Sequence, residues 1–347
     1  MRICFFIGSR ANYGRLKMVI QEAILTGWRV DLIVASQGLK VKHEYNKYVR
    51  LKIDALMFND THSNMVFTTS IIAEHVSNYF AEPENRPDFA LVHGDRYECL
   101  GFALAVSYNN VPLVHTEGGE ITGSIDNKVR SAITALADYH FTATLESKNR
   151  LASMFNVDPK RVWFSGSPAI DYLKFLDLTT GDSMKDYGII IFHPNTTAVE
   201  DFDTFYEAVK ILQDQIKLYW INPNVDPGNK SILKKIHSLD KVEFLKDVKP
   251  ELFYTYMYNC NFILGNTSAG IKEGGFLGVP YVLVGKRQDG REYGLNISFV
   301  DLDTEAIVKA SKYFIPRLYR YPRCVNKWGN GLASEMIMQK LKEELEW

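Results

Sequence analysis

The chain has 347 residues, of which 46% are hydrophobic and 23% are charged, and its formal net charge is -1. This length is enough for two domains of about 150 residues each. The near-neutral charge excludes a broad electrostatic attraction to nucleic acid or to an anionic membrane, although a local basic site for a phosphorylated ligand stays compatible with it.

Cysteine usage and hydropathy narrow the class further. The four cysteines lie far apart and form no Cys-x-x-Cys pair, which argues against a disulfide framework and against a cysteine-rich zinc site. The first apolar run is broken by Arg10 and does not read as a signal peptide. No apolar stretch approaches the roughly 20 residues that span a bilayer. We therefore expect a cytoplasmic enzyme.

In chain order, short apolar runs alternate with helical patterns over the first half. This alternation is typical of a parallel, doubly wound sheet. The expected strands are 3–7, 30–35, 89–92, 113–114, 140–143 and 162–164. The expected helices are 13–26, 63–80, 100–109, 129–136 and 147–155, the last with Ser147 as N-cap.

Periodicity is weakest from Gly166 to about Tyr187, and we interpret this stretch as the crossing between domains. A second α/β series follows it. The expected strands are 188–192, 218–221, 242–245, 262–264 and 281–284, and the expected helices are 201–213, 231–238, 250–258, 271–277, 304–314 and 331–345. The pattern predicts an α/β protein with two Rossmann-like domains facing a central cleft, residues 1–168 and 187–315.

Two acidic motifs follow neighbouring predicted strands, at residues 93–98 and 115–120. Ligands of open α/β sheets bind outside the carboxyl ends of the strands, so we expect Asp95, Glu117 and Asp126 to share one crevice and to transfer protons. Each carboxylate taken alone can instead cap a helix, as Asp126 can before residues 129–136, or pair with an arginine, as Glu98 can. If like charges share the crevice, at least one carboxylate, Glu120 included, should have a raised pKa.

Two segments that run from a strand into a helix are candidates for binding an anion. The first carries Arg10 and Arg15 but lacks the Gly-x-Gly-x-x-Gly fingerprint, and an ordinary turn with solvated arginines is the alternative. The second runs from Leu264 to Gly274. There the Thr267 and Ser268 hydroxyls and the next backbone N–H groups can cradle a diphosphate, while Glu273 can accept from a ribose. A helix start capped by Ser268 is the alternative.

Other polar residues at strand ends are weaker candidates. His193 ends the first strand of the second domain and can donate to a phosphate or a sugar hydroxyl, although a lone histidine is more often structural. Arg287 and Arg291 lie on a Gly-flanked loop that suits ligand anchoring or a closing lid, or else is simply solvated. The spacing of His93 and His115 is compatible with metal ligands, but no His-x-x-x-His helix or Asp/His cluster completes a site, and we predict no metal.

Together these motifs resemble the UDP-N-acetylglucosamine 2-epimerase family, most closely its hydrolysing branch, which supplies N-acetylmannosamine-type sugars for sialic and related nonulosonic acids. The resemblance runs from Gly8 to Arg291. It implies the two-domain fold of GT-B glycosyltransferases, with residues 316–347 forming a C-terminal helix that crosses back to the first domain. It also implies a homodimer or homotetramer. The motifs that carry the resemblance are residues 93–98, residues 117–126 with Arg130, residues 192–194 and residues 267–274.

The resemblance also implies the chemistry. The family removes the proton on carbon 2 and expels UDP, giving a 2-acetamidoglucal, and water then adds to give the manno configuration. Asp95, Glu117 and Asp126 match the acid/base carboxylates of the family. The nucleotide or phosphate contacts match Arg10, His193, Ser268 and Glu273, within a wider expected binding set of Arg15, Glu98, Thr267, Ala269, Gly270, Arg287 and Arg291. No cofactor is implied, because UDP is a good leaving group.

Two positions depart from the family pattern. Arg15 stands where some relatives carry lysine, so it should contact an anion and cannot act as a base. Ala269 replaces a serine of many relatives, which removes one hydroxyl. The resemblance also leaves the sugar open, because relatives accept either UDP-N-acetylglucosamine or a 2,4-diacetamido-2,4,6-trideoxy sugar on UDP or GDP. The alternatives are a non-hydrolysing epimerase, a GT-B glycosyltransferase with an acceptor site, and a silent sugar-nucleotide sensor.

Overall fold

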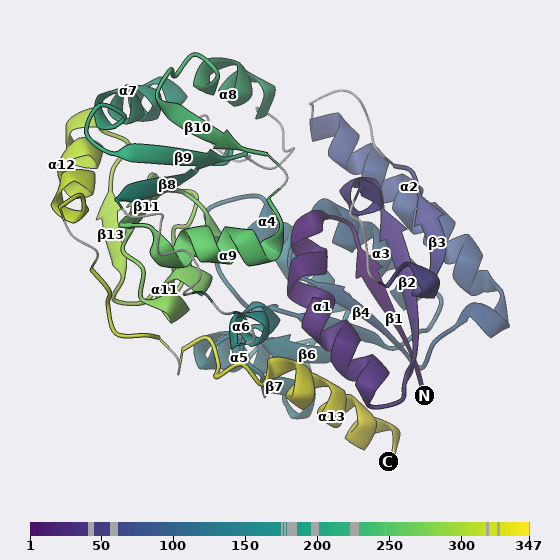
Figure 1. Ribbon diagram of the computed structural model, residues 1–347. Helices are drawn as coiled ribbons and strands as arrows, with labels where there is room; N and C mark the ends of the chain where they lie inside the picture. Colours follow the sequence, from purple (N-terminus) through teal and green to yellow (C-terminus); the bar gives the residue numbers. More distant parts are fainter. Residues whose placement is uncertain are drawn as a thin grey trace. The chain divides into compact units, whose positions relative to one another are not determined.

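The computed structural model describes residues 1–40, 45–55, 62–174, 176, 178, 186–195, 201–222, 229–246, 248–316, 319–324 and 327–346, without the side chains of residues 10, 62 and 63. The chain forms two compact units (Figure 1). Unit 1 comprises Met1–Glu120, Asp126–Lys174 and Asn326–Trp347. Unit 2 comprises Ile121–Ile125 and Phe175–Val325.

Unit 1 is built on a seven-stranded sheet whose described pairings are all parallel, in the order β3-β2-β1-β4-β5-β6-β7. The strand order reverses between β1 and β4, which makes that edge the topological switch point. The strands are β1 Arg2–Ile7, β2 Arg29–Ala35, β3 Val49–Ile53, β4 Phe89–His93, β5 Leu113–Thr116, β6 Tyr139–Thr142 and β7 Val162–Phe164. The helices are α1 Arg10–Leu25, α2 His62–Ala81, α3 Tyr97–Tyr108, α4 Asp126–Leu136, α5 Leu145–Ala152, α6 Pro168–Lys174 and α13 Ala333–Leu345.

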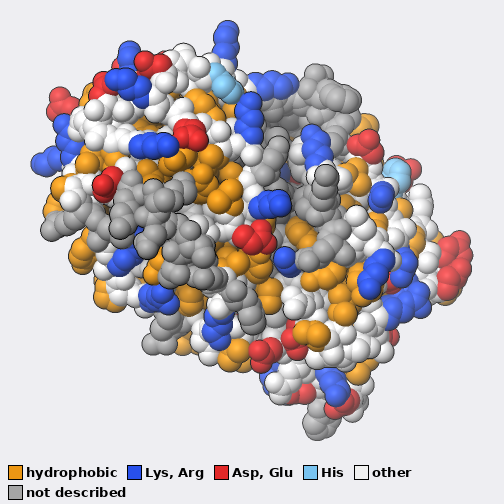
Figure 2. Space-filling view, viewed as in Figure 1, with side chains coloured by type: hydrophobic (Ala, Val, Ile, Leu, Met, Phe, Trp, Pro, Cys, Tyr) orange, Lys and Arg blue, Asp and Glu red, His pale blue; other side chains and the backbone are white. Residues whose placement is uncertain are grey.

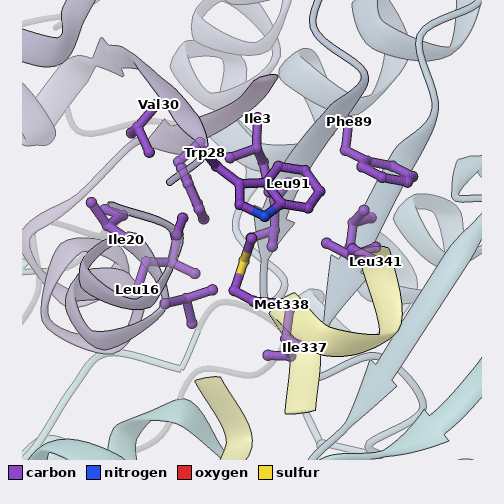
Figure 3. Close-up of a cluster of buried hydrophobic side chains, with 14 of the residues drawn as sticks. Ile3, Leu16, Ile20, Trp28, Val30, Phe89, Leu91, Ile337, Met338 and Leu341 are labelled. Carbon is purple, nitrogen blue, oxygen red and sulfur yellow. The ribbon is translucent and has the colours of Figure 1, made fainter. Parts of the chain in front are cut away.

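Helices bury both faces of this sheet. Alternate residues of β1 point to opposite sides, so that Phe5 joins the cluster under α1 while Phe6 joins the cluster under α2 and α3. The first cluster also receives Ile337, Met338 and Leu341 from α13 (Figure 3). The C-terminal helix therefore completes the core of unit 1, as the family resemblance implied.

Unit 2 has a six-stranded sheet in the order β10-β9-β8-β11-β12-β13, again with parallel pairings, and its order reverses between β8 and β11. The expected α/β class is confirmed in both units. The strands are β8 Tyr187–Ile191, β9 Lys217–Ile221, β10 Val242–Leu245, β11 Phe262–Gly265, β12 Tyr281–Val284 and β13 Ile297–Val300. The helices are α7 Phe202–Leu212, α8 Asn229–Ile236, α9 Pro250–Asn259, α10 Ser268–Ile271, α11 Glu273–Leu277 and α12 Thr304–Phe314.

Two strands were missed and three local expectations were wrong. The edge strands β3 and β13 were not predicted, because edge strands carry polar residues and lack a long apolar run. Residues 168–174, assigned to the crossing, form the buried helix α6. The single helix expected at 271–277 is two short helices separated at Lys272. The N-cap expected at Ser147 is Thr144, whose hydroxyl accepts from the Ser147 N–H.

The last two features of the fold concern surface charge and helix hydropathy. On the face shown in Figure 2, lysine and arginine side chains are interspersed with aspartate and glutamate, in keeping with a net charge of -1. Within the described part of the chain, no helix is both long and apolar enough to cross a bilayer.

Candidate active site

The switch point of unit 1 brings the loops after β1 and β4 together. Ser9 caps α1 by accepting from the Asn12 N–H at 3.2 Å, and the Asn12 side chain donates to the His93 carbonyl at 3.2 Å. The buried Asn12 thereby fixes the end of β4, from which Asp95 follows. The side chain of Arg10, an expected phosphate contact, lies outside the described residues.

Asp95 is paired with a buried arginine. Arg130, only 1% exposed, forms an ion pair with the Asp95 carboxylate and donates to the Glu120 carbonyl at 2.9 Å and to Asn127 Oδ1 at 3.3 Å. Burial lowers the pKa of the Arg130 guanidinium, but the nearby Asp95 and Glu120 carboxylates raise it, and the net shift is upward. Asp95 therefore stands beside a permanent cation while its own side chain stays 27% exposed, which suits a carboxylate that must reach a substrate.

Glu117 follows the neighbouring strand and is almost completely buried. Its backbone lies in the left-handed region, at φ 63°, and its N–H donates to the Phe141 carbonyl at 2.8 Å. One carboxylate oxygen accepts from the Ser167 hydroxyl. The other lies 3.5 Å from Arg15 Nη1 and 3.6 Å from His93 Nε2. Arg15 therefore pairs with a carboxylate of the site.

The ends of β4 and β5 place these two carboxylates in register. Gly94 N–H donates to the Thr116 carbonyl at 3.0 Å, so Asp95 and Glu117 each come directly after one hydrogen-bonded pair. Asp126 is the first residue of α4 and is half-buried; it lies inside the helix, and not at the N-cap position considered from the sequence. The expected raised pKa in this carboxylate set stays a prediction.

Glu98 and the two histidines support this arrangement. Glu98 is buried, and its carboxylate accepts from Arg96 Nε at 3.0 Å and from Arg96 Nη2 at 3.1 Å. This confirms that Glu98 pairs with an arginine. His115 Nε2 donates to the Gly94 carbonyl at 2.8 Å, and burial lowers its pKa to about 4. His93 Nδ1 lies 2.9 Å from the Thr116 hydroxyl. Among the described residues no three His, Cys, Asp or Glu side chains converge as metal ligands would.

In unit 2 the switch point lies between β8 and β11, where His193 and Asn266 follow the strands. The Asn266 side chain is completely buried. Its Oδ1 accepts from the His193 N–H at 2.8 Å and its Nδ2 donates to the His193 carbonyl at 2.8 Å. Asn266 was missed from the sequence, although a polar residue directly after a buried strand is the same signal that identified Asp95.

The loop after β11 is shaped by close backbone contacts. Gly265, at φ 139°, leaves no room for a side chain because a Cβ would stand 2.1 Å from the Ile191 carbonyl oxygen. Thr267, and not Ser268, is the N-cap, and its hydroxyl accepts from the Ala269 N–H at 3.2 Å. Ser268 and Ala269 are half-buried, whereas Gly270 packs on the Tyr281 ring. The Ser268 hydroxyl is thus not used as the cap.

Three further expected binding residues lie around this loop. Glu273 opens α11 and is only 3% exposed. Arg287 donates to the Asn266 carbonyl at 3.2 Å, joined by Gln288 at 2.9 Å, and Arg291 is buried. The loop after β12 is therefore packed against the loop after β11, which contradicts the solvated alternative for the two arginines.

Comparison with known proteins places this architecture in one family. Residues 25–342 match the family model described as UDP-N-acetylglucosamine 2-epimerase. The chain is 28% identical to UDP-N,N'-diacetylbacillosamine 2-epimerase (hydrolyzing) of Legionella pneumophila, over 98% of this chain and 95% of that protein. It is 29% identical to UDP-N-acetylglucosamine 2-epimerase of Neisseria meningitidis, over 89% and 86%.

Solved structures share the fold. The UDP-N-acetylglucosamine 2-epimerase of Neisseria meningitidis bound to UDP-GlcNAc matches with a TM-score of 0.77 at 18% identity, covering 99% of this chain and 100% of that one. The enzyme of Methanocaldococcus jannaschii in complex with UDP-GlcNAc and UDP matches with a TM-score of 0.79 at 17% identity, covering 99% and 100%. The two parallel α/β units are thus those of the GT-B-like fold.

Proposed function

We propose, from the premise that the chain belongs to the UDP-N-acetylglucosamine 2-epimerase family, that it is a hydrolysing 2-epimerase. Its substrate is UDP-N-acetylglucosamine or a UDP-2,4-diacetamido-trideoxy sugar. Its products are UDP and the free manno-configured sugar, for sialic or nonulosonic acid synthesis. The observation that carries this proposal is the pair of carboxylates, Asp95 and Glu117, after adjacent strand ends, each beside a guanidinium.

The reaction needs two proton transfers at carbon 2. In the first step a carboxylate takes the proton from carbon 2 while the bond between carbon 1 and the diphosphate oxygen breaks. Its electron pair leaves with UDP, and a double bond forms between carbons 1 and 2. Water then adds across the double bond. Its hydroxyl goes to carbon 1, and carbon 2 receives a proton on the face opposite to the one from which the first proton was taken. Because the carbon-bound proton is weakly acidic, positioned carboxylates must assist, and we assign this work to Asp95, Glu117 and Asp126.

The leaving group needs a different kind of site. The diphosphate gains a negative charge as it departs, and this charge is stabilised by cations and by backbone N–H groups that are in place beforehand. We assign UDP binding to Arg10, His193, Thr267, Ser268 and Glu273. The support in unit 2 is the placement of His193 and Ser268 at the switch point of its sheet, where α/β proteins bind ligands.

Two observations favour hydrolysis over release of a UDP-linked product. Residues 117–126 contain the motifs Gly118-Gly119-Glu120 and Ile125-Asp126, which resemble those of the hydrolysing branch. The Legionella relative, which aligns with 98% of this chain, is named as a hydrolysing enzyme.

The test is incubation with UDP-N-acetylglucosamine, and separately with the diacetamido substrate, in deuterated water, followed by NMR. Free UDP with a manno sugar deuterated at carbon 2 is the expected result. A deuterated UDP-linked manno sugar would replace the proposal with the non-hydrolysing reaction. Turnover only when an acceptor is supplied would replace it with glycosyl transfer, and UDP binding without turnover of either sugar would make the protein a sensor.

The amide variants Asp95→Asn, Glu117→Gln and Asp126→Asn test the residues. Each should reduce turnover at least 100-fold while UDP affinity, measured by calorimetry, stays within a factor of about three. Wild-type turnover in all three variants would overturn the site assignment.

A further inference from the structure

We propose that Ser167 is a positioning residue for the Glu117 carboxylate, and that residues 327–331, here called the C-terminal strap, hold Ser167 in place. This inference rests on the proposed catalytic role of Glu117. It gives the C-terminal segment a function in the reaction, beyond its part in the core of unit 1.

The contacts of Glu117 show why a positioning residue is needed. Oε2 lies 3.5 Å from Arg15 Nη1, at the outer limit of a hydrogen bond, and 3.6 Å from His93 Nε2. The Ser167 hydroxyl donates to the other oxygen, Oε1. Because a hydrogen bond weakens steeply with distance and misalignment, the Ser167 hydroxyl constrains the orientation of the carboxylate more than the two long contacts to Oε2 do.

Ser167 is itself fixed by the strap. It is only 1% exposed, and its N–H donates to the Trp328 carbonyl at 2.8 Å. Next to it, Gly166 and Gly329 touch: a Cβ on either would stand 2.7 Å from the Cα of the other. Both glycines have positive φ, 82° and 89°, so that this contact needs glycine at both positions.

A second anchor ties the strap to the same part of the fold. Asp171, one turn beyond Ser167, accepts from the Ala333 N–H at 3.1 Å and the Ser334 N–H at 2.6 Å, the first two residues of α13. The indole of Trp328 is buried. The strap is therefore bonded to Ser167 at Trp328, and the helix that follows it is capped by Asp171.

Ser165 provides a matched control within the same loop. It is also buried, but its hydroxyl donates to the Gly166 carbonyl at 2.9 Å and to the Thr142 carbonyl at 3.5 Å, both backbone groups. Ser165→Ala thus removes a buried hydroxyl two residues away without touching the carboxylate.

The experiment compares Ser167→Ala, Ser167→Thr and Ser165→Ala by steady-state kinetics of UDP release across pH. Ser167→Ala should lower kcat by about 10- to 100-fold with KM changed by less than about threefold. Losing a donor to the carboxylate should also move the acid limb of the kcat/KM profile upward by about one pH unit. Ser167→Thr, which keeps the hydroxyl, should recover most of kcat, and Ser165→Ala should match the wild type.

Three results would overturn the inference: wild-type kcat in Ser167→Ala, an equal loss in Ser165→Ala, or a loss of kcat without a shift of the acid limb. If Ser167→Ala fails to fold, Ser167→Cys carries the same test, since it keeps the volume and offers a weaker donor. Gly329→Ala, which displaces the strap from Gly166, should reproduce the Ser167→Ala profile. Glu117→Gln separates the two hypotheses. Full turnover in Glu117→Gln refutes the catalytic role of Glu117. If Glu117→Gln is inactive while Ser167→Ala keeps wild-type turnover, only the role of Ser167 is refuted.

Discussion

The side-chain amide of Asn266 binds the backbone of His193. Its Oδ1 accepts from the His193 backbone N–H and its Nδ2 donates to the His193 backbone carbonyl, each at 2.8 Å. The pair joins the ends of β8 and β11 at the switch point of unit 2. The backbone carbonyl of Asn266 accepts hydrogen bonds from the Arg287 and Gln288 side chains. Asn266 therefore links three strand-end loops, two through its side-chain amide and the third through its backbone carbonyl.

Replacing Asn266 by aspartate should weaken UDP binding. The variant keeps the acceptor for the His193 N–H, but it places a carboxylate oxygen against the His193 carbonyl where a donor stood. We expect UDP affinity to fall at least tenfold and the free energy of unfolding to fall by about 1–3 kcal/mol. Asn261→Asp is the control: Asn261 is also buried in unit 2 and donates to the Ile315 carbonyl at 2.9 Å. It should cost similar stability and leave calorimetric UDP affinity unchanged; equal affinities in both variants would refute the role of Asn266.

Arg130→Lys should reduce turnover although the charge is conserved. A single ammonium cannot reach Asp95, the Glu120 carbonyl and Asn127 together as the guanidinium does. We expect kcat to fall at least tenfold. Arg50→Lys is the control, because Arg50 Nε lies 2.8 Å from another buried carboxylate of unit 1, Asp31. It should leave kcat intact, and a comparable loss there would show that the effect is general destabilisation.

Acid should destabilise the protein through two buried histidines. Burial lowers the pKa of His115 to about 4 and that of His140 to about 3, from an ordinary value of 6.5. Between these values and 6.5 the unfolded chain binds protons that the folded chain does not, so stability falls as pH falls from 6.5 to about 4 and levels off below the folded pKa values. Each histidine contributes a slope of about 1.4 kcal/mol per pH unit.

Urea unfolding at several pH values measures that slope. In His115→Gln the slope between pH 6 and 4.5 should be lower than in the wild type by about one histidine's contribution. The comparison of slopes, rather than of absolute stabilities, removes the packing change caused by the substitution. An unchanged slope would mean that His115 is protonated in the folded protein.

Asp171→Asn should loosen the start of α13. The N-cap residue Leu332 makes no side-chain cap, so the Asp171 carboxylate supplies the two acceptors for the first turn. Loss of a cap costs about 1 kcal/mol. Hydrogen exchange should accelerate at the amides of Ala333 and Ser334 and stay unchanged in α12, which is capped by Asp303. Unchanged exchange in α13 would show that packing alone holds the helix.

The sequence predicted the buried parts of this fold and missed the parts whose stability comes from tertiary contacts. Long apolar runs located β4 and β8 to within one residue. The helix α6 was missed because seven residues carry too little periodicity, and it is burial that makes it helical. Strand-end reasoning identified Asp95 and Glu117, and the same rule applied to β7 would have pointed to Ser167, which was instead assigned to the crossing.

Hydrogen-bond partners could not be predicted in the same way. The sequence places Arg130 on a helix and Asn266 after a strand, but only the fold shows that each is buried and which backbone groups it binds. The choice of Thr267 over Ser268 as the cap is also a matter of backbone conformation, because Gly265 directs the chain at that turn.

The backbone of Glu117 has a consequence for how this protein tolerates mutation. A non-glycine residue at φ 63° costs about 1–2 kcal/mol in the left-handed region. Glu117→Gly should therefore relieve local strain, but it also removes the carboxylate that pairs with Arg15 and accepts from the Ser167 hydroxyl. Removing one partner of a buried pair costs about 3–5 kcal/mol, which exceeds the strain. Selection for thermal stability and selection for turnover should therefore both retain glutamate at position 117, and a library screened only for heat resistance should keep it.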